Sequence, residues 1–370
     1  MSSMRSFGSI FLRTGANEKI RAAEKEGAAM IRYLEQEEKG RTKALWEEAF
    51  SEDSQSFVNY YYEEKMKDNR VLVFEREGQI VSMLHRNPYR IWLRGTECSC
   101  DYLVGISTTA SERGKGRMRS LILQVLRDMQ EERQPFTFLM PARESLYTPY
   151  DFRFIYDQPR WVLHYNKYMK RVPYRPGSMS AELAEWQNAW LKRQYDVFAI
   201  RDAAYMERMD KELASENGEC RLVYDDDWFV GMESEWGIKE REQRYLYTGE
   251  KYRGEVSRKP AIMARIVCLP EFMKHIRLAE DCPYEKLILD IGVNDLFIPQ
   301  NQGGWMWKIT KKGSEFIQES RFLSKGKMAV FSIGELTEWL FGYKVPEQVK
   351  NLPNWEYIET FKHVFLDEIV

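Results

Sequence analysis

The sequence predicts a chain that combines α/β and α+β domains, and three observations support this fold class. Patterns typical of helices and of strands alternate along nearly the whole chain. A strand at Leu103–Thr108 leads through a glycine-containing loop into an amphipathic helix, whose apolar residues recur at helical spacing: Met118, Leu121, Ile122, Val125, Leu126 and Met129. The length of 370 residues is sufficient for two or three domains with separate cores.

The composition excludes several classes of function. A hydrophobic share of 44% with 30% charged residues is typical of a globular protein, and the net charge of −2 lacks the basic excess of a nucleic-acid-binding protein. Apolar runs stay well short of the roughly 18 residues that a membrane span needs, so none is expected. Five scattered cysteines indicate a reducing, cytoplasmic environment. Neither the cysteines nor the four histidines have the spacing of metal ligands, so no metal site is expected.

The first block begins near Met30. Residues 1–29 lack any acid before Glu18, and we expect them to be a loose N-terminal extension. From Ile31 the pattern predicts helices, one at 44–50 and a second at 57–67. Four successive strands should follow: Val71–Glu75, Gln79–His85, Tyr89–Leu93 and Cys98–Thr108. Beyond the amphipathic helix the pattern predicts a strand, a short helix and a strand: Phe136–Met140, Ser145–Tyr150 and Trp161–Met169.

The segment Arg113–Arg117, at the junction of the strand and the amphipathic helix, predicts a phosphate-binding loop. Gly114 and Gly116 allow backbone N–H groups to turn toward one point, and the start of the helix adds positive partial charge there. Arg113, Lys115 and Arg117 surround that point with cations. The spacing differs from that of dinucleotide-binding glycine loops and of P-loops. The alternative interpretation is a solvated basic turn before a surface helix.

Two further blocks follow a proline- and glycine-containing linker at Lys170–Ser178. The second block predicts two helices and then three strands: Glu182–Gln194, Ala203–Ala214, Cys220–Tyr224, Trp228–Glu233 and Arg244–Thr248. The third block opens at Met263–Phe272. It predicts a meander of strands and a late helix: Lys286–Ile291, Asp295–Pro299, Gly304–Thr310, Lys327–Ser332 and Ile333–Phe341.

The loop Arg113-Gly-Lys-Gly116 resembles the pyrophosphate loop of the GNAT acetyltransferases, whose pattern is Arg/Gln-x-x-Gly-x-Gly/Ala. Met118 stands where that pattern usually has Gly or Ala, and a bulky residue there is a feature of the enhanced intracellular survival (Eis) family. The first and the last segment of the third block are also similar to those of that family, namely Met263-Ala-Arg-Ile-Val and Val364-Phe-Leu-Asp-Glu-Ile-Val370. The resemblance covers the chain from about residue 30 onward.

This resemblance implies a fold for each block. Residues 30–170 would be a catalytic domain with the GNAT acyltransferase fold, and residues 171–262 a degenerate GNAT-like domain. Residues 263–370 would be a sterol-carrier-like α+β domain. The family also implies assembly into homo-oligomers, namely hexamers.

The resemblance further implies acetyl-CoA as cosubstrate and direct acetyl transfer to a primary amine. Ile106, Ser107 and Thr108 would pair with the pantetheine arm. The pyrophosphate would be held by the loop, namely Arg113, Gly114, Lys115, Gly116, Arg117 and Met118. Tyr156, in Arg153-Phe-Ile-Tyr-Asp157, would be the general acid, although Ile155 and Asp157 replace the glycines of the family; Tyr147 and Tyr150 are rivals. Val370 would supply a C-terminal carboxylate that orients the amine or works through water.

The acceptor implied by the family is an aminoglycoside-like polyamine or a lysine side chain, bound in an acidic and aromatic cavity. Glu35, Tyr60 and Glu64 are candidates for its lining. Charges on a helix are, however, often a solvated face. A second hypothesis of a different class is a protein that holds CoA or a lipid on the same scaffold without turnover.

Overall fold

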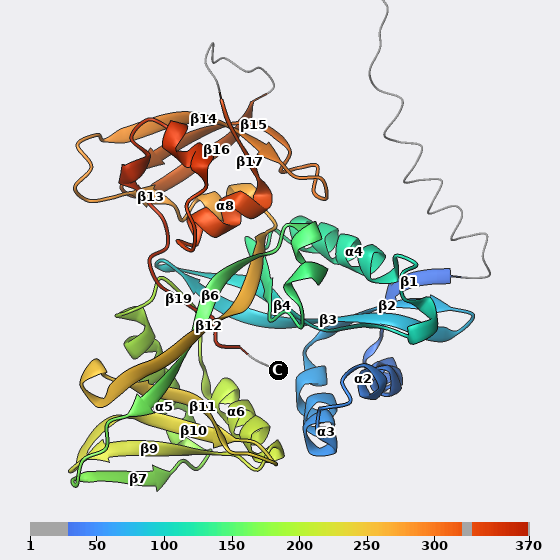
Figure 1. The fold of residues 1–370 in the computed structure, drawn as a ribbon, viewed down its shortest axis with the longest axis vertical. Helices are drawn as coiled ribbons and strands as arrows, with labels where there is room; N and C mark the ends of the chain where they lie inside the picture. Colours follow the sequence, from blue (N-terminus) through green and yellow to red (C-terminus); the bar gives the residue numbers. More distant parts are fainter. Residues whose placement is uncertain (1–28, 320–327, 369–370) are drawn as a thin grey trace, which may run out of the picture.

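The computed structural model describes residues 29–319 and 328–368. A long twisted sheet crosses the middle of the molecule, with a second part below it and a third part above it (Figure 1). Within the described ranges this sheet has nine strands, in the order β1-β2-β3-β4-β5-β12-β6, with β8 beside β3 and β19 beside β8. Their bounds are β1 Ala29–Tyr33, β2 Arg70–Arg76, β3 Gln79–Leu93, β4 Thr96–Thr108, β5 Phe136–Leu139, β6 Arg153–Leu163, β8 Val197–Ala199, β12 Arg253–Ile266 and β19 Val364–Phe365.

Helices cover both faces of the first sheet (Figure 1). The helix α4, Arg117–Glu131, lies on one face, where its predicted apolar stripe is buried except for Met118, which is half-buried. On the opposite face lie a 3-10 helix at Gln36–Thr42, α2 at Lys43–Ala49 and α3 at Gln55–Glu64. Trp46 and Tyr61 anchor these helices, and both side chains are buried among Val71, Val73 and Met83 of the sheet. The sheet and α4 are therefore held from both sides, which fixes the start of α4 relative to β4.

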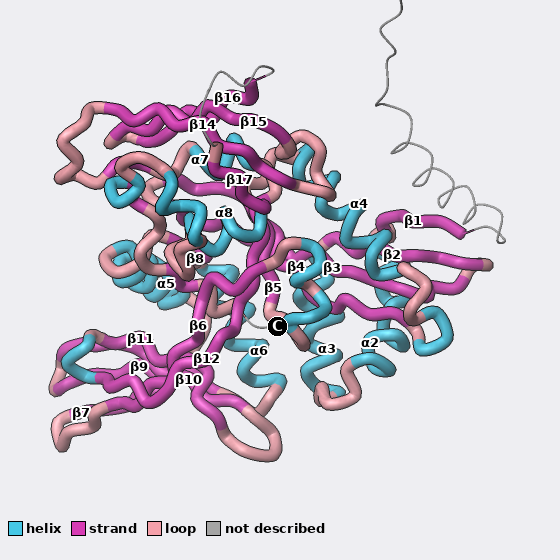
Figure 2. Tube along the Cα trace, turned by 45° about the horizontal axis from the view of Figure 1, so that its top comes forward, coloured by secondary structure: helices cyan, strands magenta, loops and turns pink. Residues whose placement is uncertain are grey.

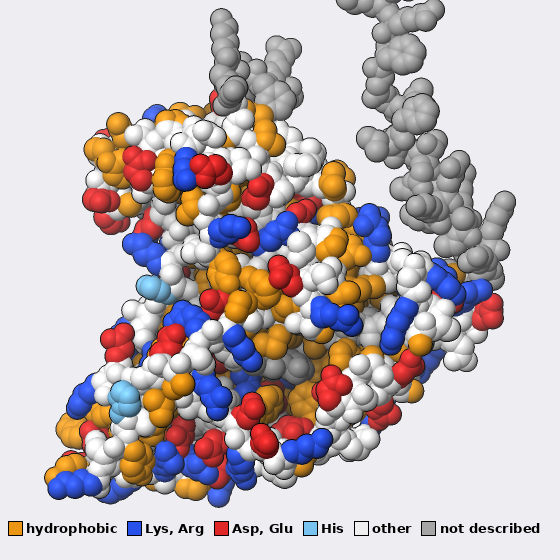
Figure 3. Space-filling view, in the orientation of Figure 1, with side chains coloured by type: hydrophobic (Ala, Val, Ile, Leu, Met, Phe, Trp, Pro, Cys, Tyr) orange, Lys and Arg blue, Asp and Glu red, His pale blue; other side chains and the backbone are white. Residues whose placement is uncertain are grey.

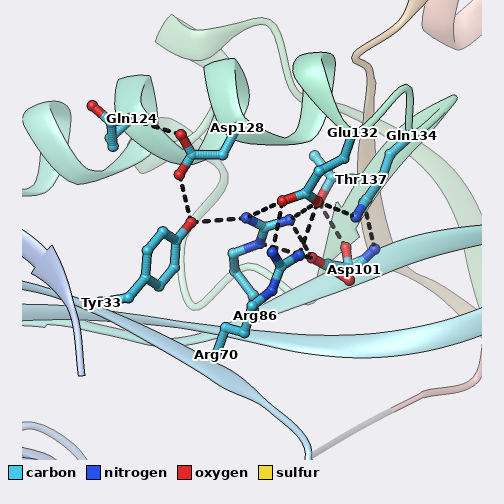
Figure 4. A network of polar contacts seen from close by, with 9 residues as sticks. All are labelled: Tyr33, Arg70, Arg86, Asp101, Gln124, Asp128, Glu132, Gln134 and Thr137. Atoms are coloured by element: carbon cyan, nitrogen blue, oxygen red, sulfur yellow. Dashed lines mark hydrogen bonds and ion pairs between the residues drawn. The ribbon is translucent and has the colours of Figure 1, made fainter. Parts of the chain in front are cut away.

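A buried polar network ties α4 to the sheet (Figure 4). Arg86 of β3 is fully buried, and its guanidinium contacts Asp101 of β4 and Glu132 at the end of α4, both at 2.6 Å. The Tyr33 hydroxyl accepts from Arg86 at 2.8 Å and donates to Asp128 of α4 at 2.6 Å. Because the buried cation has carboxylate partners, its desolvation is offset. The network therefore stabilises one position of α4 on the sheet.

Two expectations for the first block are wrong. Residues 31–33 belong to strand β1, which pairs with β2, and the helices begin only at Gln36. The strands expected at Gln79–His85 and Tyr89–Leu93 form one strand, β3. Pro88 does not break it, because the pairing with β2 ends at Arg86 and the pairing with β8 starts at Ile91. On the side of β3 that faces β2 and β8, Pro88 therefore lies between the two pairings, where no backbone N–H donor is needed.

The second part is a four-stranded sheet, in the order β11-β10-β9-β7, with two helices (Figure 2). The elements are β7 Met169–Pro173, α5 Ser178–Lys192, α6 Ala203–Ser215, β9 Glu219–Asp225, β10 Trp228–Trp236 and β11 Glu242–Thr248. The predicted helices and the strands β9 to β11 are confirmed. The linker expected at Lys170–Ser178 is wrong in its first half, because Met169–Pro173 pairs with β9 as an edge strand. The expected strand Trp161–Met169 is likewise split between β6 and β7.

The third part contains a four-stranded sheet in the order β16-β15-β14-β17. Its elements are α7 Leu269–Met273, β13 Arg277–Leu278, β14 Lys286–Asn294, β15 Gly303–Thr310, β16 Gly313–Glu319, β17 Ala329–Ser332, α8 Ile333–Leu340 and β18 Ile358–Glu359. The strand expected at Asp295–Pro299 is wrong, since the Asp295 carboxylate accepts from the amides of Phe297 and Ile298 in a turn. Asp295 also pairs with Arg265 of β12 at 2.6 Å, and both side chains are buried.

Strand β12 joins the parts of the molecule. It pairs with β5 on one side and with β6 on the other, so it belongs to the first sheet. The boundary expected between residues 262 and 263 falls within this strand. The segment 361–368 then returns to the first sheet through β19, and Phe361, Leu366 and Glu368 are all buried. No helix in the described part of the chain is long and apolar enough to cross a membrane.

Candidate active site

Strands β4 and β5 form a fork. They run parallel and pair at Tyr102 opposite Phe138, and β4 then continues to Thr108 alongside β3. Ser107 and Thr108 lie opposite Met83 and Ser82 of β3. On the side toward β5, the backbone pairing found among residues 29–319 and 328–368 ends at the fork, so Ile106, Ser107 and Thr108 lie on an open strand edge. Such an edge can accept an extended ligand as an additional strand.

A glycine allows the bend in β4 next to the fork. Gly105 has a φ of 59°, and the register between β3 and β4 shifts at the same place. A Cβ at Gly105 would lie 2.6 Å from Cζ3 of the buried Trp46 ring. A glycine inside a strand often marks a bulge, so Gly105 was a signal in the sequence for this bend.

The predicted phosphate loop lies between the end of β4 and the start of α4. Gly114 and Gly116 have φ values of 76° and 77°, and residues 113–116 are exposed. Gly116 is the N-cap of α4, and it has no side chain that could bond the first amides of the helix. Arg113 donates from Nε to the Thr108 carbonyl at 3.1 Å, which links the loop to the open edge of β4. The loop residues that the sequence predicted are thus brought together with Ile106–Thr108.

Glu112 organises the cations of the loop, and sequence reasoning missed it. Its carboxylate accepts from Lys115 at 2.8 Å and from Arg117 at 2.9 Å, and Arg76 of β2 lies 3.3 Å away. The hydrogen bonds from Lys115 and Arg117 lower the Glu112 pKa to about 2. Arg117 also lies over the Phe74 ring, 4.4 Å from its centroid. Two of the three expected cations are therefore anchored rather than free, and Met118 packs against the core behind them.

Tyr156, the expected general acid, is not at the fork. It lies on β6 opposite Ile262, and β12 runs between β6 and β5. Neighbouring strands are about 5 Å apart, so β6 is about 10 Å from β5. The Tyr156 ring packs against Phe365 of the C-terminal segment, with centroids 6.0 Å apart. Burial raises the pKa of its hydroxyl well above the usual value.

Tyr147 lies closer to the fork. It follows the 3-10 helix Glu144–Leu146 that comes after β5, and it packs in the cluster that contains Leu139 of β5 and Leu103 of β4. In the part of the chain that the structure describes, no hydrogen bond of its hydroxyl is found. Burial raises its pKa to about 12, so the phenol stays protonated at neutral pH. Tyr150, the other rival, is half-buried beside Phe297 and Arg119.

A cavity of about 310 Å³ opens on the face of the fork opposite α4. Tyr89 in its wall contacts both residues of the fork, with ring centroids 6.3 Å from Tyr102 and 6.0 Å from Phe138. The cavity lies between the first sheet and α6, and its lining includes four carboxylates and three cations: Asp68, Asp202, Glu212, Glu368, Lys65, Arg90 and Arg208. The space-filling view shows the molecule hollowed at this place, with charged side chains of both signs around it (Figure 3).

Two of the carboxylates are held deep in this cavity. Glu368 accepts from the Tyr205 hydroxyl at 2.8 Å and lies 3.2 Å from Arg201. Glu212 lies 3.8 Å from Lys65, whose pKa burial lowers. Val370, whose carboxylate was expected at the active site, lies outside the described residues. Glu368, two positions earlier, has only 3% of its surface exposed.

The expected acceptor residues lie at two separate places. The Tyr60 hydroxyl donates to Glu212 at 3.1 Å, so it lies behind the cavity at the contact of α3 with α6. Glu64 pairs with Lys67 at 2.9 Å and with Lys211 of α6 at 2.8 Å, so its charge is used in the same contact. Glu35 is exposed at the start of the first 3-10 helix, where it forms a capping box with Glu38. Only Tyr60 is thus close to the cavity.

Comparisons with known proteins agree with this geometry. A family model described as an acetyltransferase (GNAT) domain matches residues 30–155. A probable N-acyltransferase from Enterococcus faecalis V583 has 15% identity and a TM-score of 0.70, and the match covers 90% of this chain and 94% of that chain. A GCN5-related N-acetyltransferase from Kribbella flavida has 12% identity and a TM-score of 0.72, with 92% and 99% covered. Eis1 from Mycobacterium abscessus has 10% identity and a TM-score of 0.67, also with 92% and 99% covered.

The search of curated proteins finds no significant match. At these identities the solved structures establish a shared fold along some nine-tenths of the chain. The family match falls on the residues that build the fork, the glycine loop and α4. Residues 30–155 of the chain therefore form a GNAT acetyltransferase domain.

Proposed function

We propose that the protein transfers the acetyl group of acetyl-CoA directly to a primary amine of a small molecule or of a lysine side chain. The observation that carries this proposal is the position of the fork between two binding features. The exposed glycine loop lies at one end of the open β4 edge, and the cavity with four carboxylates lies on the opposite face of the fork. A cofactor and a cationic acceptor can thus reach the same point from two sides.

The residues of the loop fit a pyrophosphate. The amides at the start of α4 are exposed and have no capping side chain, and helix N-termini bind phosphate groups through such amides. Arg113 is exposed and joins the loop to Thr108, so it can contact phosphate without leaving the strand end. The open edge at Ile106–Thr108 offers backbone groups to the amides of a pantetheine arm. A backbone N–H at this edge can also donate to the thioester oxygen as negative charge develops there.

The cavity on the far face fits an amine. Its four carboxylates pair with cations of the chain, two of them only loosely, since Glu212 lies 3.8 Å from Lys65 and Asp202 lies 3.5 Å from Arg90. Tyr89 places the wall of the cavity against the two residues of the fork. A protonated amine is attracted to such a surface, and aromatic rings favour cations at short range. Glu368 is held by Tyr205 and Arg201, so its carboxylate has a fixed position toward which an amine can be oriented. The role of the Val370 carboxylate in orienting the amine remains a prediction from the sequence.

The transfer needs two proton movements. The nitrogen of the acceptor attacks the carbonyl carbon of the thioester, the C–S bond breaks, and the nitrogen loses one proton. The leaving thiolate takes one proton, and we assign this donation to Tyr147. Its side chain packs in the same cluster as Leu103 of β4 and Leu139 of β5, and its pKa of about 12 keeps the proton in place until a thiolate forms. This assignment replaces Tyr156, because β12 lies between Tyr156 and the fork.

The test is an acetyl-transfer assay that follows thiol release from acetyl-CoA with a panel of acceptors. The panel contains aminoglycosides, linear polyamines and lysine peptides, and the N-acetylated forms of the same compounds serve as matched controls. We expect thiol release with at least one free amine and none with its acetylated form. Calorimetry with CoA is run in parallel. Binding of CoA without turnover of any amine would show a binding protein instead of an enzyme.

A further inference from the structure

A second cavity, of about 520 Å³, lies where the three parts of the molecule meet. Its wall comes from β6, from the turn after α5, from the turn after α8 and from the segment before β19. Four cations line it, namely Arg193, Arg253, Arg258 and Lys362, against two carboxylates, Asp157 and Glu250. Asp157 already accepts from the Tyr343 hydroxyl at 2.6 Å. The cavity therefore carries a surplus of positive charge.

Arg253 is the unusual residue of this cavity. It is 8% exposed, and its Nε and Nη1 are buried without a hydrogen-bond partner among residues 29–319 and 328–368. The guanidinium lies over Trp161, 4.0 Å from the ring centroid, and 5.2 Å from that of Trp190. These contacts hold its position, and the Tyr195 hydroxyl lies beside it. The nearby Glu255 carboxylate is paired with Arg258 at 2.7 Å, so in the described residues no carboxylate forms an ion pair with Arg253. A buried cation without such a partner is costly.

Tyr156 supplies a second donor of the same kind. Its side chain is 6% exposed, and its hydroxyl has no hydrogen-bond partner in the described residues. It lines the same cavity as Arg253. A guanidinium edge offers two parallel N–H groups, which match the two oxygens of a carboxylate or phosphate. A phenol offers one more donor to such a group.

We propose that this cavity binds a small-molecule oxyanion, a phosphate or carboxylate group that contacts Arg253 and Tyr156. The burial of Arg253 excludes a macromolecular surface, and a cavity of this size is in the range of small-ligand sites. The site is separate from the glycine loop, since it is built by β6, β12 and the C-terminal segment. It does not depend on the acetyl-transfer reaction. A bound oxyanion would connect all three parts of the molecule and stabilise their arrangement.

The experiment measures the thermal denaturation of the full chain with inorganic phosphate or citrate, at constant ionic strength set by sodium chloride. We expect a rise of the midpoint by several degrees at millimolar concentration for the wild type, because a ligand that binds the folded state stabilises it. A rise with phosphate but not with citrate would identify a phosphate site. A rise with citrate but not with phosphate would identify a carboxylate site.

Two variants locate the effect. Arg253→Met keeps an unbranched apolar stem and removes the guanidinium with its charge, so we expect a higher midpoint without added oxyanion and no rise with it. Tyr156→Phe keeps the cation and should need about a tenfold higher concentration for the same rise, as for the loss of one charge-assisted hydrogen bond. Lys286→Met, at an exposed position of β14, is the matched control and should respond like the wild type, whereas Lys115→Met reports any phosphate that the glycine loop binds.

The proposal is overturned by either of two results. One is a wild type without any rise up to tens of millimolar oxyanion. The other is an equal rise in the wild type and in both cavity variants, which would place the binding elsewhere, with a loss in Lys115→Met pointing to the glycine loop. If Arg253→Met does not fold, Tyr156→Phe decides alone, because its backbone and packing are unchanged.

Discussion

The carboxylate of Glu112 accepts a hydrogen bond from Nε of Arg117 at 2.9 Å, across the glycine loop. The same carboxylate holds Lys115 at 2.8 Å, so one acid fixes two of the three cations that follow it in the chain. The hydrogen bonds lower the Glu112 pKa to about 2. A depressed carboxyl pKa stabilises the folded loop above pH 4.5 and ceases to do so as the pH falls toward 2.

Glu112→Gln tests whether this arrangement serves cofactor binding. We expect the KM for acetyl-CoA to rise several-fold with kcat within about twofold, because binding is lost equally before and during the reaction. Steady-state kinetics at pH 7 measure both constants. Glu131→Gln, on the exposed end of the same helix, is the control and should be neutral. A fall in KM would show that the net charge of the loop matters more than its order.

Gly116→Ala tests the left-handed backbone of the loop. The φ of 77° is unfavourable for alanine by about 1 kcal/mol, although a Cβ would meet no atom within 4 Å. We expect weaker binding of CoA in calorimetry and a slightly lower stability toward urea. Gly40→Ala is matched, since its Cβ also meets no atom but its φ is ordinary. Equal effects of the two substitutions would contradict the importance of the loop conformation.

Tyr147→Phe separates the two tyrosines that can donate a proton. We expect kcat to fall by about 10²-fold, a usual size for a lost general acid, with little change in the KM for acetyl-CoA. The kcat–pH profile should also lose its decline at high pH, because the phenol with a pKa of about 12 no longer titrates. A large loss in Tyr156→Phe with none in Tyr147→Phe would restore the assignment made from the sequence.

Asp367→Asn tests a pH dependence of stability. Burial raises the Asp367 pKa from 3.8 to about 6, and Arg244, Glu368 and Gln158 are the neighbours that modify it. Between these values the folded state holds a proton that the unfolded state releases, so the free energy of unfolding falls as the pH rises from 4 to 6. The loss is complete about one pH unit above the folded-state pKa of about 6.

The asparagine variant cannot titrate. Its free energy of unfolding, relative to that of the wild type, should rise by on the order of 2 kcal/mol between pH 4 and pH 6.5. Urea denaturation at a series of pH values measures the difference. Asp226→Asn, at an exposed turn between β9 and β10, should follow the wild type at every pH. A constant difference between the Asp367 variant and the wild type would contradict the shifted pKa.

The parts of the site that were predictable are local in sequence. The strand β4, the glycine loop and α4 are adjacent, and their residue pattern alone determines turn, helix start and buried stripe. Glu112 was missed because a single acid among cations gives no pattern. Its role appears only when the loop folds back and brings Lys115 and Arg117 to one carboxylate.

The parts that were missed depend on distant pairing. Whether Pro88 ends a strand depends on which neighbours β3 has on that side, and β8 comes from residues 197–199. The position of Tyr156 depends on β12, which inserts between β5 and β6 from far along the chain. Glu64 forms an ion pair with Lys211 of α6, and the charge pattern of α3 alone cannot predict this contact.

The insertion of β12 also has a consequence for synthesis on the ribosome. β5 and β6 are made before the second part, and the strand that bridges them emerges only after it. At about 5–20 residues per second, some ninety residues of translation leave the edges of β5 and β6 without that bridge for on the order of ten seconds. During this interval the nascent chain presents the kind of unpaired strand edge that chaperones bind.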